Sequence, residues 1–83
     1  MIQMYTSKWC SYCSAAKNLL NELNLEYEEI NIEEKNISRS KLQELSGGYT
    51  IPQISINGDF IGGYNELQHL HQNNKLMPLV NNE

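Results

Sequence analysis

The sequence predicts an α/β protein whose four-stranded mixed sheet is flanked by three helices. Segments with the alternation of strands and segments with the periodicity of helices follow one another in the order β-α-β-α-β-β-α. The length of 83 residues suits one domain, residues 1–83, and leaves no room for a second hydrophobic core. The order of elements indicates a parallel strand pair in the first half and an antiparallel hairpin in the second.

The first half of the chain predicts a strand, a helix and a second strand. Residues 2–6 form the first strand and residues 26–32 the second. Residues 11–24 between them have one apolar face, because hydrophobic residues recur every three or four positions: Ala16, Leu19, Leu20 and Leu23. Strand, helix and strand in this order predict two parallel strands joined by a right-handed crossover.

The second half predicts a helix followed by a hairpin. Residues 37–46 form the helix, which ends at a pair of glycines and turns three apolar side chains inward: Ile37, Leu42 and Leu45. Residues 52–56 alternate as a strand does, and Asn57-Gly58 favours a type I′ turn. Residues 59–62 are therefore expected to return as the antiparallel partner.

The last predicted helix begins at Asn65, which is a good N-cap residue. Leu67 and Leu70 lie on one face of this helix. The Asn-rich tail, residues 73–83, is expected to dock loosely and to fray at its end. Its apolar residues are Met77, Leu79 and Val80.

Charge and hydropathy exclude two classes of partner. The formal net charge is −4, and the six basic residues are scattered, whereas a nucleic-acid surface needs clustered Lys and Arg. The apolar stretches are far shorter than the roughly 20 residues that span a membrane. The first residues have neither a basic segment nor a long apolar segment, so we expect no secretory signal and a cytoplasmic, reducing location.

Cys10 and Cys13 are the only cysteines of the sequence. Cys10 falls where the first strand meets the first helix, and there the free amides and the dipole of the helix favour a thiolate. Lys8 adds a positive charge, so both effects are expected to lower the pKa of Cys10. Cys13 lies one helical turn further on the same side, from which it can attack a mixed disulfide formed at Cys10.

Two other interpretations of a Cys-x-x-Cys pair compete with redox chemistry. A zinc site needs four ligands, and His69 and His71 point to opposite faces of the predicted helix. A purely structural disulfide is uncommon in a reducing compartment. The strand–Cys-x-x-Cys–helix context favours a redox pair. The histidines and the acidic residues Glu26, Glu28 and Glu29 are interpreted as solvated surface.

Two further motifs each allow a structural and a functional interpretation. Pro52 either begins a strand or follows a cis bond that turns the backbone of Ile51 toward the cysteines, where a substrate backbone can pair with it. The glycines of Gly62-Gly63-Tyr64-Asn65 either end a strand or expose N–H groups that suit a carboxylate. Neither motif decides alone between its two interpretations.

Taken together, these stretches resemble the glutaredoxin family over nearly the whole chain. The similar segments are Tyr5-Thr6 before Lys8, Cys10-Ser11-Tyr12-Cys13, Thr50-Ile51-Pro52-Gln53, Gly62-Gly63 leading to Leu67, and Leu76-Met77-Pro78-Leu79. The resemblance implies the thioredoxin fold and glutathione as the redox partner. It also implies a glutathione-dependent oxidoreductase that reduces protein disulfides and glutathione mixed disulfides.

Carried onto the matching positions, the resemblance assigns roles to individual residues. Cys10 becomes the nucleophile and Cys13 the resolving thiol. The implied glutathione-binding residues are Lys8 and Tyr12 along the groove, Ile51 beside cis-Pro52, and Gly63, Tyr64 and Asn65 at the start of the last helix, where N–H groups would hold the γ-glutamyl carboxylate.

Departures from the family pattern keep other functions open. Ser11 stands where most members have proline, and glutaredoxins with Cys-Ser-Tyr-Cys after a tryptophan, as at Trp9, include some that bind a [2Fe–2S] cluster through Cys10 of each of two subunits. Otherwise we expect a monomer. Gly48-Tyr49 replaces a common basic residue, which leaves Arg39 as a conceivable contact for the glycyl carboxylate. Reduction by thioredoxin reductase is a further alternative.

Overall fold

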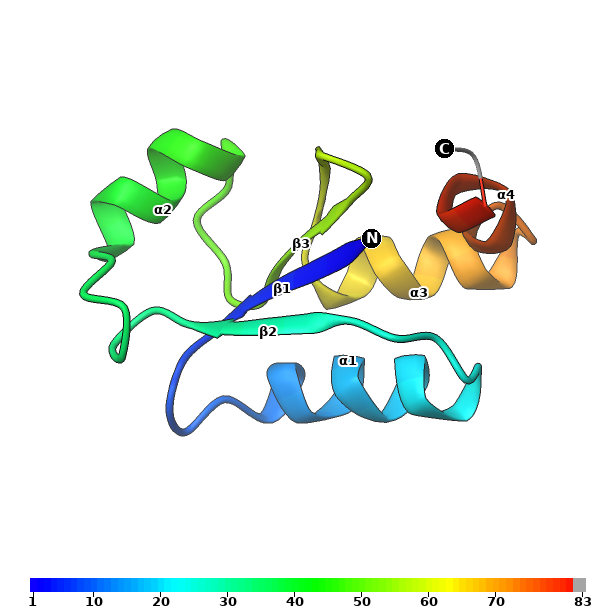
Figure 1. Ribbon diagram of the computed structural model, residues 1–83, viewed down its shortest axis with the longest axis horizontal. Helices are drawn as coiled ribbons and strands as arrows, with labels where there is room; N and C mark the ends of the chain where they lie inside the picture. Colours follow the sequence, from blue (N-terminus) through cyan, green and yellow to red (C-terminus); the bar gives the residue numbers. More distant parts are fainter. Residues whose placement is uncertain (82–83) are drawn as a thin grey trace.

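The computed structural model describes residues 1–81, which form one mixed sheet with four helices (Figure 1). The sheet has the strand order β2-β1-β3-β4. In Figure 1, α1 and α2 lie on opposite sides of strands β1 and β2, and α1 packs against α3. The elements in chain order are β1 (Ile2–Thr6), α1 (Ser11–Glu22), β2 (Glu28–Asn31), α2 (Arg39–Ser46), β3 (Gln53–Ile56), β4 (Asp59–Gly62), α3 (Tyr64–Gln72) and α4 (Leu76–Asn81).

The pairing of the strands confirms the predicted mixed sheet. Strand β1 is parallel to β2 and antiparallel to β3, and β3 is antiparallel to β4. The hairpin turn has positive φ at both central residues, 52° at Asn57 and 93° at Gly58, as a type I′ turn requires. Because β1 and β3 are antiparallel, the end of β1 lies beside the start of β3, and the loops that follow β1 and precede β3 meet at one end of the sheet.

The hydrophobic core lies between the sheet and the helices α1, α3 and α4. Alternate residues of β1 are buried, as the period of a strand dictates. The main core cluster consists of Ile2, Met4, Ala16, Leu20, Ile54, Ile56, Leu67 and Leu76. Burying a side chain of this size contributes roughly 1.5–3 kcal/mol relative to leaving it exposed. The predicted inward faces of the first and last helices are thus confirmed.

Several predicted boundaries were too generous. Strand β2 covers Glu28–Asn31 rather than 26–32, and α1 ends at Glu22 because Asn24 has a left-handed φ of 57°. Helix α2 begins at Arg39 rather than at 37, since the hydroxyl of Ser38 accepts a hydrogen bond from the Lys41 N–H at 3.0 Å and caps it.

Two predictions about side chains of helices were wrong. Leu45 was predicted to face inward but is 47% exposed, and Leu42 is the buried residue of α2. Asn65 does not cap α3. The N-cap is Gly63, whose N–H donates to the carboxylate of Glu66 at 2.7 Å, so the side chain that caps this helix comes from within the helix.

The tail forms a fourth helix that the prediction of three helices omitted. Leu76 is 1% exposed and joins the core, whereas Met77 and Leu79 remain 43% and 39% exposed. The Asn57 side chain donates to the carbonyls of Leu79 and Val80, so the hairpin turn holds the end of α4. The fraying expected at the chain end falls on residues 82–83, outside the described residues.

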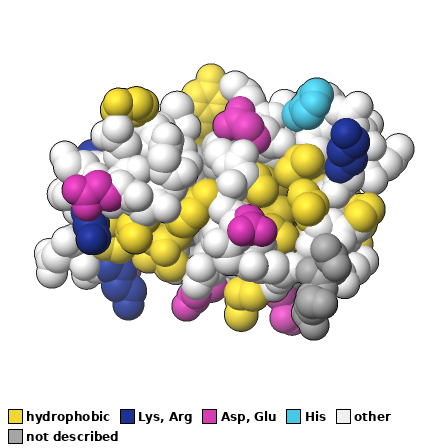
Figure 2. Space-filling view, turned by 90° about the horizontal axis from the view of Figure 1, so that it is seen from above, with side chains coloured by type: hydrophobic (Ala, Val, Ile, Leu, Met, Phe, Trp, Pro, Cys, Tyr) yellow, Lys and Arg dark blue, Asp and Glu magenta, His cyan; other side chains and the backbone are white. Residues whose placement is uncertain are grey.

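The surface carries charges of both signs. On the face shown in Figure 2, Lys and Arg side chains lie toward the two ends of the molecule, and acidic side chains lie both between them and beside the basic side chains at the left end. Among residues 1–81, no helix is long and apolar enough to cross a membrane.

Candidate active site

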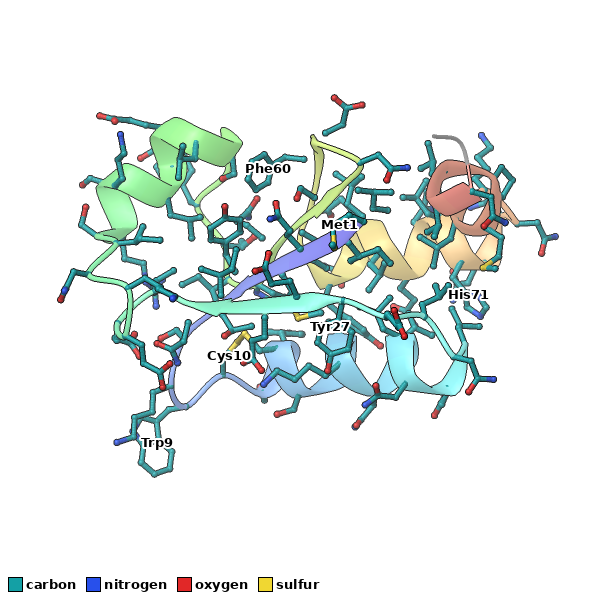
Figure 3. All side chains as sticks on the ribbon, in the orientation of Figure 1. Met1, Trp9, Cys10, Tyr27, Phe60 and His71 are labelled. Carbon is teal, nitrogen blue, oxygen red and sulfur yellow. A yellow bond between two sulfur atoms is a disulfide. The ribbon has the colours of Figure 1, made fainter. Side chains whose placement is uncertain are left out.

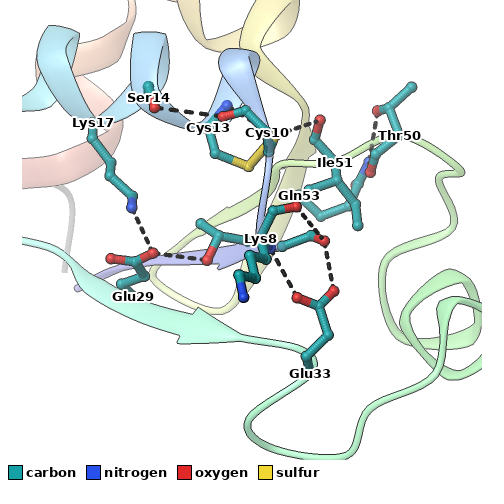
Figure 4. Close-up of a disulfide and its surroundings, with 12 residues drawn as sticks. Lys8, Cys10, Cys13, Ser14, Lys17, Glu29, Glu33, Thr50, Ile51 and Gln53 are labelled. Carbon is teal, nitrogen blue, oxygen red and sulfur yellow. Dashed lines mark hydrogen bonds and ion pairs between the residues drawn. A yellow bond between two sulfur atoms is a disulfide. The ribbon is translucent and has the colours of Figure 1, made fainter.

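The two cysteines are joined as a disulfide at the start of α1 (Figure 4). Cys10 is the N-cap of α1, in an extended conformation, and its Sγ accepts a hydrogen bond from the Cys13 N–H at 3.1 Å. The carbonyl of Cys10 accepts the N–H of Ser14 at 3.3 Å. Cys10 thus occupies the junction that the sequence predicts. Once the disulfide is reduced, the same N–H stabilises a thiolate at this position.

The two sulfurs differ in their access to solvent. Cys13 belongs to the first turn of α1 and is 2% exposed, whereas Cys10 is partly exposed. A disulfide in solution therefore reaches Cys10 first, and Cys13 meets only a sulfur already attached to Cys10. This geometry agrees with the predicted division between an attacking and a resolving thiol.

The segment before β3 lies against Cys10. The Ile51–Pro52 bond is cis, as the functional interpretation of this proline requires. The carbonyl oxygen of Ile51 lies 3.6 Å from the Sγ of Cys10. The backbone of Ile51 is therefore next to the sulfur that would carry a substrate.

One pocket gathers most of the predicted glutathione-binding residues. It has a volume of about 170 Å³ and is lined by Tyr12, Thr50, Ile51, Pro52, Gly63, Tyr64, Asn65 and Glu66. The rings of Tyr12 and Tyr64 pair with their centroids 6.1 Å apart. Three segments that are distant in the sequence, one from α1, one before β3 and one at the start of α3, thus meet beside Cys10.

Lys8 does not line this pocket. Its ammonium lies over the ring of Trp9, 5.6 Å from the centroid, and the Trp9 side chain points away from the molecule (Figure 3). Arg39 and Tyr49 are exposed and are not part of the pocket wall either. The structure therefore separates Lys8 from the other predicted glutathione-binding residues.

The start of α3 presents backbone N–H groups to the pocket. Tyr64 and Asn65 are its first two residues, so their N–H groups have no acceptor one turn earlier within the helix. The N–H of Gly63 is already bound by the carboxylate of Glu66. Gly63 therefore lines the pocket without offering a free N–H donor to a ligand. The carboxylate of Glu66 places a negative charge beside the free N–H groups of Tyr64 and Asn65.

The glycine pair allows two walls of the pocket to approach closely. Gly62 has a φ of +115°, and a β-carbon there would overlap the side chain of Glu66. A β-carbon at Gly63 would lie 3.0 Å from the carbonyl oxygen of Pro52 and 3.1 Å from the hydroxyl of Thr50. Sequence reasoning missed Glu66, although a glutamate three residues after a helix start has the spacing of a capping box.

Thr50 is held by a buried glutamine. Gln53 is 1% exposed, and its Nε2 donates to the carbonyl oxygen of Thr50 at 2.7 Å and to the Thr50 hydroxyl at 3.0 Å. A β-carbon at Gly48 would lie 2.8 Å from the same Nε2. The wall that carries Ile51 is thus fixed from beneath by a neutral amide.

Two carboxylates hold the other side of the site, the connection between β1 and α1 (Figure 4). Glu29 of β2 accepts the hydroxyl of Thr6 at 2.8 Å and pairs with the ammonium of Lys17 at 2.6 Å. Lys17 and, more weakly, Thr6 outweigh burial and lower the pKa of Glu29. Glu29 therefore bridges β1 and α1. It lies at the surface, as predicted, and has in addition a structural role that the sequence did not indicate.

Glu33 makes the second of these bridges. Its carboxylate accepts the Ser7 hydroxyl at 2.6 Å and the Lys8 N–H at 2.8 Å. The Ser7 hydroxyl, followed by the Lys8 N–H, holds the pKa of Glu33 below its usual value. No local motif marks this residue, because its partners lie in the first strand's loop and not near it in the sequence.

Comparison with known proteins settles the family. The Glutaredoxin family model matches residues 2–61. The chain belongs to the glutaredoxin family. It is 35% identical over 79 residues to a glutaredoxin of Pseudomonas aeruginosa, which covers 95% of this chain and 94% of that relative. The Cys10–Cys13 pair is therefore the dithiol motif of a glutaredoxin-family domain.

Two further proteins are similar to this glutaredoxin, one compared by sequence and one by structure. It is 37% identical over 82 residues to the mitochondrial glutaredoxin-2 of Pongo abelii, which covers 95% of this chain and 51% of that relative. The chain thus spans about half the length of the mitochondrial relatives it matches. The crystal structure of a buckwheat glutaredoxin–glutathione complex superposes with a TM-score of 0.86 at 27% identity, covering 95% of this chain and 74% of that one. The predicted thioredoxin fold is confirmed.

Proposed function

We propose that this glutaredoxin reduces glutathione mixed disulfides and protein disulfides with glutathione as the electron donor. The observation that carries the proposal is the position of Cys10. Its sulfur accepts a helix-start N–H, lies 3.6 Å from the carbonyl oxygen of Ile51 and is more accessible than Cys13. An accessible sulfur stabilised as a thiolate beside a free backbone is suited to attack a peptide disulfide.

The reaction with a glutathionylated substrate uses Cys10 alone. The Cys10 thiolate attacks the glutathione sulfur, the substrate thiolate leaves and takes a proton from water, and Cys10 becomes joined to glutathione. A second glutathione, as its thiolate, then attacks the bound glutathione sulfur. Glutathione disulfide leaves and the Cys10 thiolate is restored, so one free glutathione is consumed for each substrate, and the glutathione taken from the substrate forms the other half of the disulfide.

A protein disulfide requires both cysteines. Cys10 attacks one substrate sulfur and releases the other as a thiolate. The Cys13 thiolate then attacks the Sγ of Cys10 and releases the second substrate thiolate, which leaves the Cys10–Cys13 disulfide seen in the structure. The short reach between Cα atoms, 5.2 Å, suits this step. Two glutathione molecules return the pair to the dithiol.

The pocket chemistry supports glutathione as the bound tripeptide. Its γ-glutamyl end carries a carboxylate and an ammonium, which match the free N–H groups of Tyr64 and Asn65 and the carboxylate of Glu66, respectively. The backbone of Ile51 faces the position of the glutathione cysteine. The tripeptide would therefore lie between α3 and the segment before β3, with its sulfur at Cys10.

The division of roles predicts different effects for two matched substitutions. Cys10→Ser should abolish reduction of a small glutathione mixed disulfide, because the attacking sulfur is lost. Cys13→Ser should keep much of that activity and lose reduction of a protein disulfide, since only the second reaction needs a resolving thiol. Turnover is followed with glutathione and, separately, with thioredoxin reductase as electron source. Equal loss in both variants, or turnover with thioredoxin reductase alone, would contradict the proposal.

The remaining functional expectations stay predictions. Among residues 1–81, no three His, Cys, Asp or Glu side chains are grouped to hold a metal ion. The rival proposal, motivated by Ser11 and Trp9, is a glutathione-assisted dimer that carries a [2Fe–2S] cluster bridged through Cys10 of each subunit. We also propose that the protein is a monomer in the absence of a cluster and lies in the cytoplasm, and reduction by thioredoxin reductase is the alternative to reduction by glutathione.

A further inference from the structure

Glu33 connects the segment after β2 to the loop that carries the nucleophile. Each of its two carboxylate oxygens binds one of two successive loop residues, Oε2 the hydroxyl of Ser7 and Oε1 the N–H of Lys8. These hydrogen bonds hold the pKa of Glu33 below its usual value, so the group is an ionised double acceptor at neutral pH. The loop lies just outside the last ladder bond of this strand pair, in which the N–H of Ile32 donates to the carbonyl of Thr6 at 2.9 Å.

The loop beyond Lys8 has little else to fix its path. Trp9 adopts a left-handed φ of 61°, which is uncommon for a bulky residue and persists where the surroundings hold it. Its side chain is 92% exposed and points away from the molecule (Figure 3), so packing of the indole does not anchor the turn. The hydrogen bonds of Ser7 and Lys8 to Glu33 are the constraint immediately before Trp9 and Cys10.

This constraint becomes more important when the enzyme is reduced. In the structure, the disulfide itself ties Cys10 to α1. After reduction, Cys10 is still bound to α1 by the Cys13 N–H at its sulfur and by the Ser14 N–H at its carbonyl oxygen, and the path of the preceding loop is the further constraint on its position. A loop free to move at Ser7 and Lys8 would let the Cys10 sulfur leave the free N–H groups that stabilise its thiolate.

We propose that Glu33 is a positioning residue, which holds Ser7 and Lys8 so that the left-handed turn at Trp9 keeps the Cys10 sulfur at the start of α1 in the reduced enzyme. The inference rests on the proposed function, in which Cys10 is the nucleophile. Glu33 acts through the loop and does not line the pocket.

The neighbouring Glu34 provides a matched control. Like Glu33, it is an exposed glutamate of the segment between β2 and α2. Within residues 1–81 the structure gives the Glu34 side chain no hydrogen bond or ion pair; only its backbone N–H is bound, to the Asn31 side chain at 3.0 Å. A general effect of removing negative charge from this segment would appear equally in Glu33→Ala and Glu34→Ala.

The test measures Cys10 directly, without glutathione. In the full chain carrying Cys13→Ser, the rate of alkylation of Cys10 by iodoacetamide is measured from pH 3 to 9. Glu33→Ala should lower the rate at neutral pH by about fivefold, a loss of the size that one or two hydrogen bonds supply, and should move the midpoint of the profile to higher pH. Ser7→Ala should have a smaller effect of the same sign, and Glu34→Ala should match the parent.

Two further variants separate positioning through hydrogen bonds from a direct effect of the Glu33 charge on the thiolate. Ser7→Ala combined with Glu33→Ala should be no slower than Glu33→Ala, because both changes release the same connection. Glu33→Gln keeps one acceptor oxygen and should fall between the parent and Glu33→Ala. A Glu33→Gln variant that reacts faster than the parent would overturn the proposal, because Glu33 would then act as a negative charge that opposes the thiolate.

The remaining outcomes distinguish the inference from the proposed function. If Glu33→Ala keeps the parent's rate and midpoint and only lowers the melting temperature, Glu33 merely stabilises the fold and the inference is wrong. If the alkylation rates change as expected but the parent enzyme does not reduce a glutathione mixed disulfide, the positioning role stands and the proposed function fails.

Discussion

The two sides of the active site are held in place by different kinds of interaction. The loop that carries Cys10 is tied by the carboxylates of Glu29 and Glu33, which lie at the surface. The opposite wall, which carries Ile51, is fixed by the buried amide of Gln53 and by glycines at which an added β-carbon would crowd the neighbouring atoms. The cysteine side therefore depends on ionisation, and the pocket side depends on close packing.

This difference agrees with the role proposed for each side, disulfide exchange on the cysteine side and glutathione binding on the pocket side. The sulfur of Cys10 must change its bonding in every cycle, and hydrogen bonds between the loop and an exposed carboxylate tolerate the small shifts that this involves. The pocket wall must present one backbone geometry to each incoming glutathione, and a dense arrangement of Thr50, Gly63 and Gln53 holds that geometry. Substitutions on the pocket side should therefore reduce stability through lost packing, whereas those on the cysteine side should have effects that depend on the charge of a carboxylate.

The largest effect is expected from Gly62→Ala. Its φ of +115° disfavours any side chain, and the new β-carbon would push Glu66 away from the Gly63 N–H. We expect a loss of about 2–3 kcal/mol in the free energy of unfolding and weaker binding of glutathione. Gly58→Ala is the matched control, since Gly58 also has a positive φ, 93°, but open space around it. Urea unfolding of both variants makes the comparison, and equal losses would show that the contact with Glu66 contributes nothing.

A smaller loss is expected from Gln53→Ala. The substitution removes the donor to the Thr50 carbonyl and hydroxyl and leaves a cavity at a position that is 1% exposed. A loss of about 2 kcal/mol in stability follows. Because the wall beside Ile51 loosens, KM for a glutathione mixed disulfide should rise more than kcat falls. Steady-state kinetics at several substrate concentrations check this, and a fall in kcat alone would argue against a role for Gln53 in shaping the pocket.

The sequence was sufficient to predict the features that leave a local signal. The alternation in β1, the apolar face of α1 and the Asn57-Gly58 turn each follow from neighbouring residues. Together they predict the parallel pair and the hairpin, whereas the pairing of β1 with β3 that joins them was seen only in the structure. The position of Cys10 at a helix start followed from the same signals. The glutathione-binding positions came instead from the family resemblance, and six of them line one pocket while Lys8 lies apart.

What the sequence did not reveal has particular physical causes. Helix α4 has six residues, fewer than periodicity can detect, and contains Pro78 in its first turn, where a missing N–H does no harm. The cap of α3 was assigned to Asn65 because the side chain that caps it, Glu66, lies inside the helix. Glu29 and Glu33 were overlooked because their partners Thr6 and Ser7 become neighbours only when β1 and β2 pair.

The smallest effect on the free energy of unfolding is expected from removing the charge of Glu29, on the side of the site that carries the cysteines. Lys17 lowers the pKa of Glu29 in the folded protein. A carboxyl whose folded pKa is depressed contributes stability above its unfolded pKa, and this contribution is lost as the pH falls through the folded pKa. The Glu29 side chain is 39% exposed, so solvent screening keeps the contribution below about 1 kcal/mol.

Unfolding by urea between pH 7 and pH 3 tests this expectation. At pH 7, Glu29→Gln should be slightly less stable than the parent, and the difference should shrink once the pH falls below the usual carboxyl range, about pH 4. Glu34→Gln, which removes a carboxylate without these partners, should show no such convergence. If the difference in unfolding free energy between Glu29→Gln and the parent does not change with pH, the charge of Glu29 does not contribute to the stabilisation that its bonds to Thr6 and Lys17 provide. The cysteine side would then be held by geometry, as the pocket side is, and not by charge.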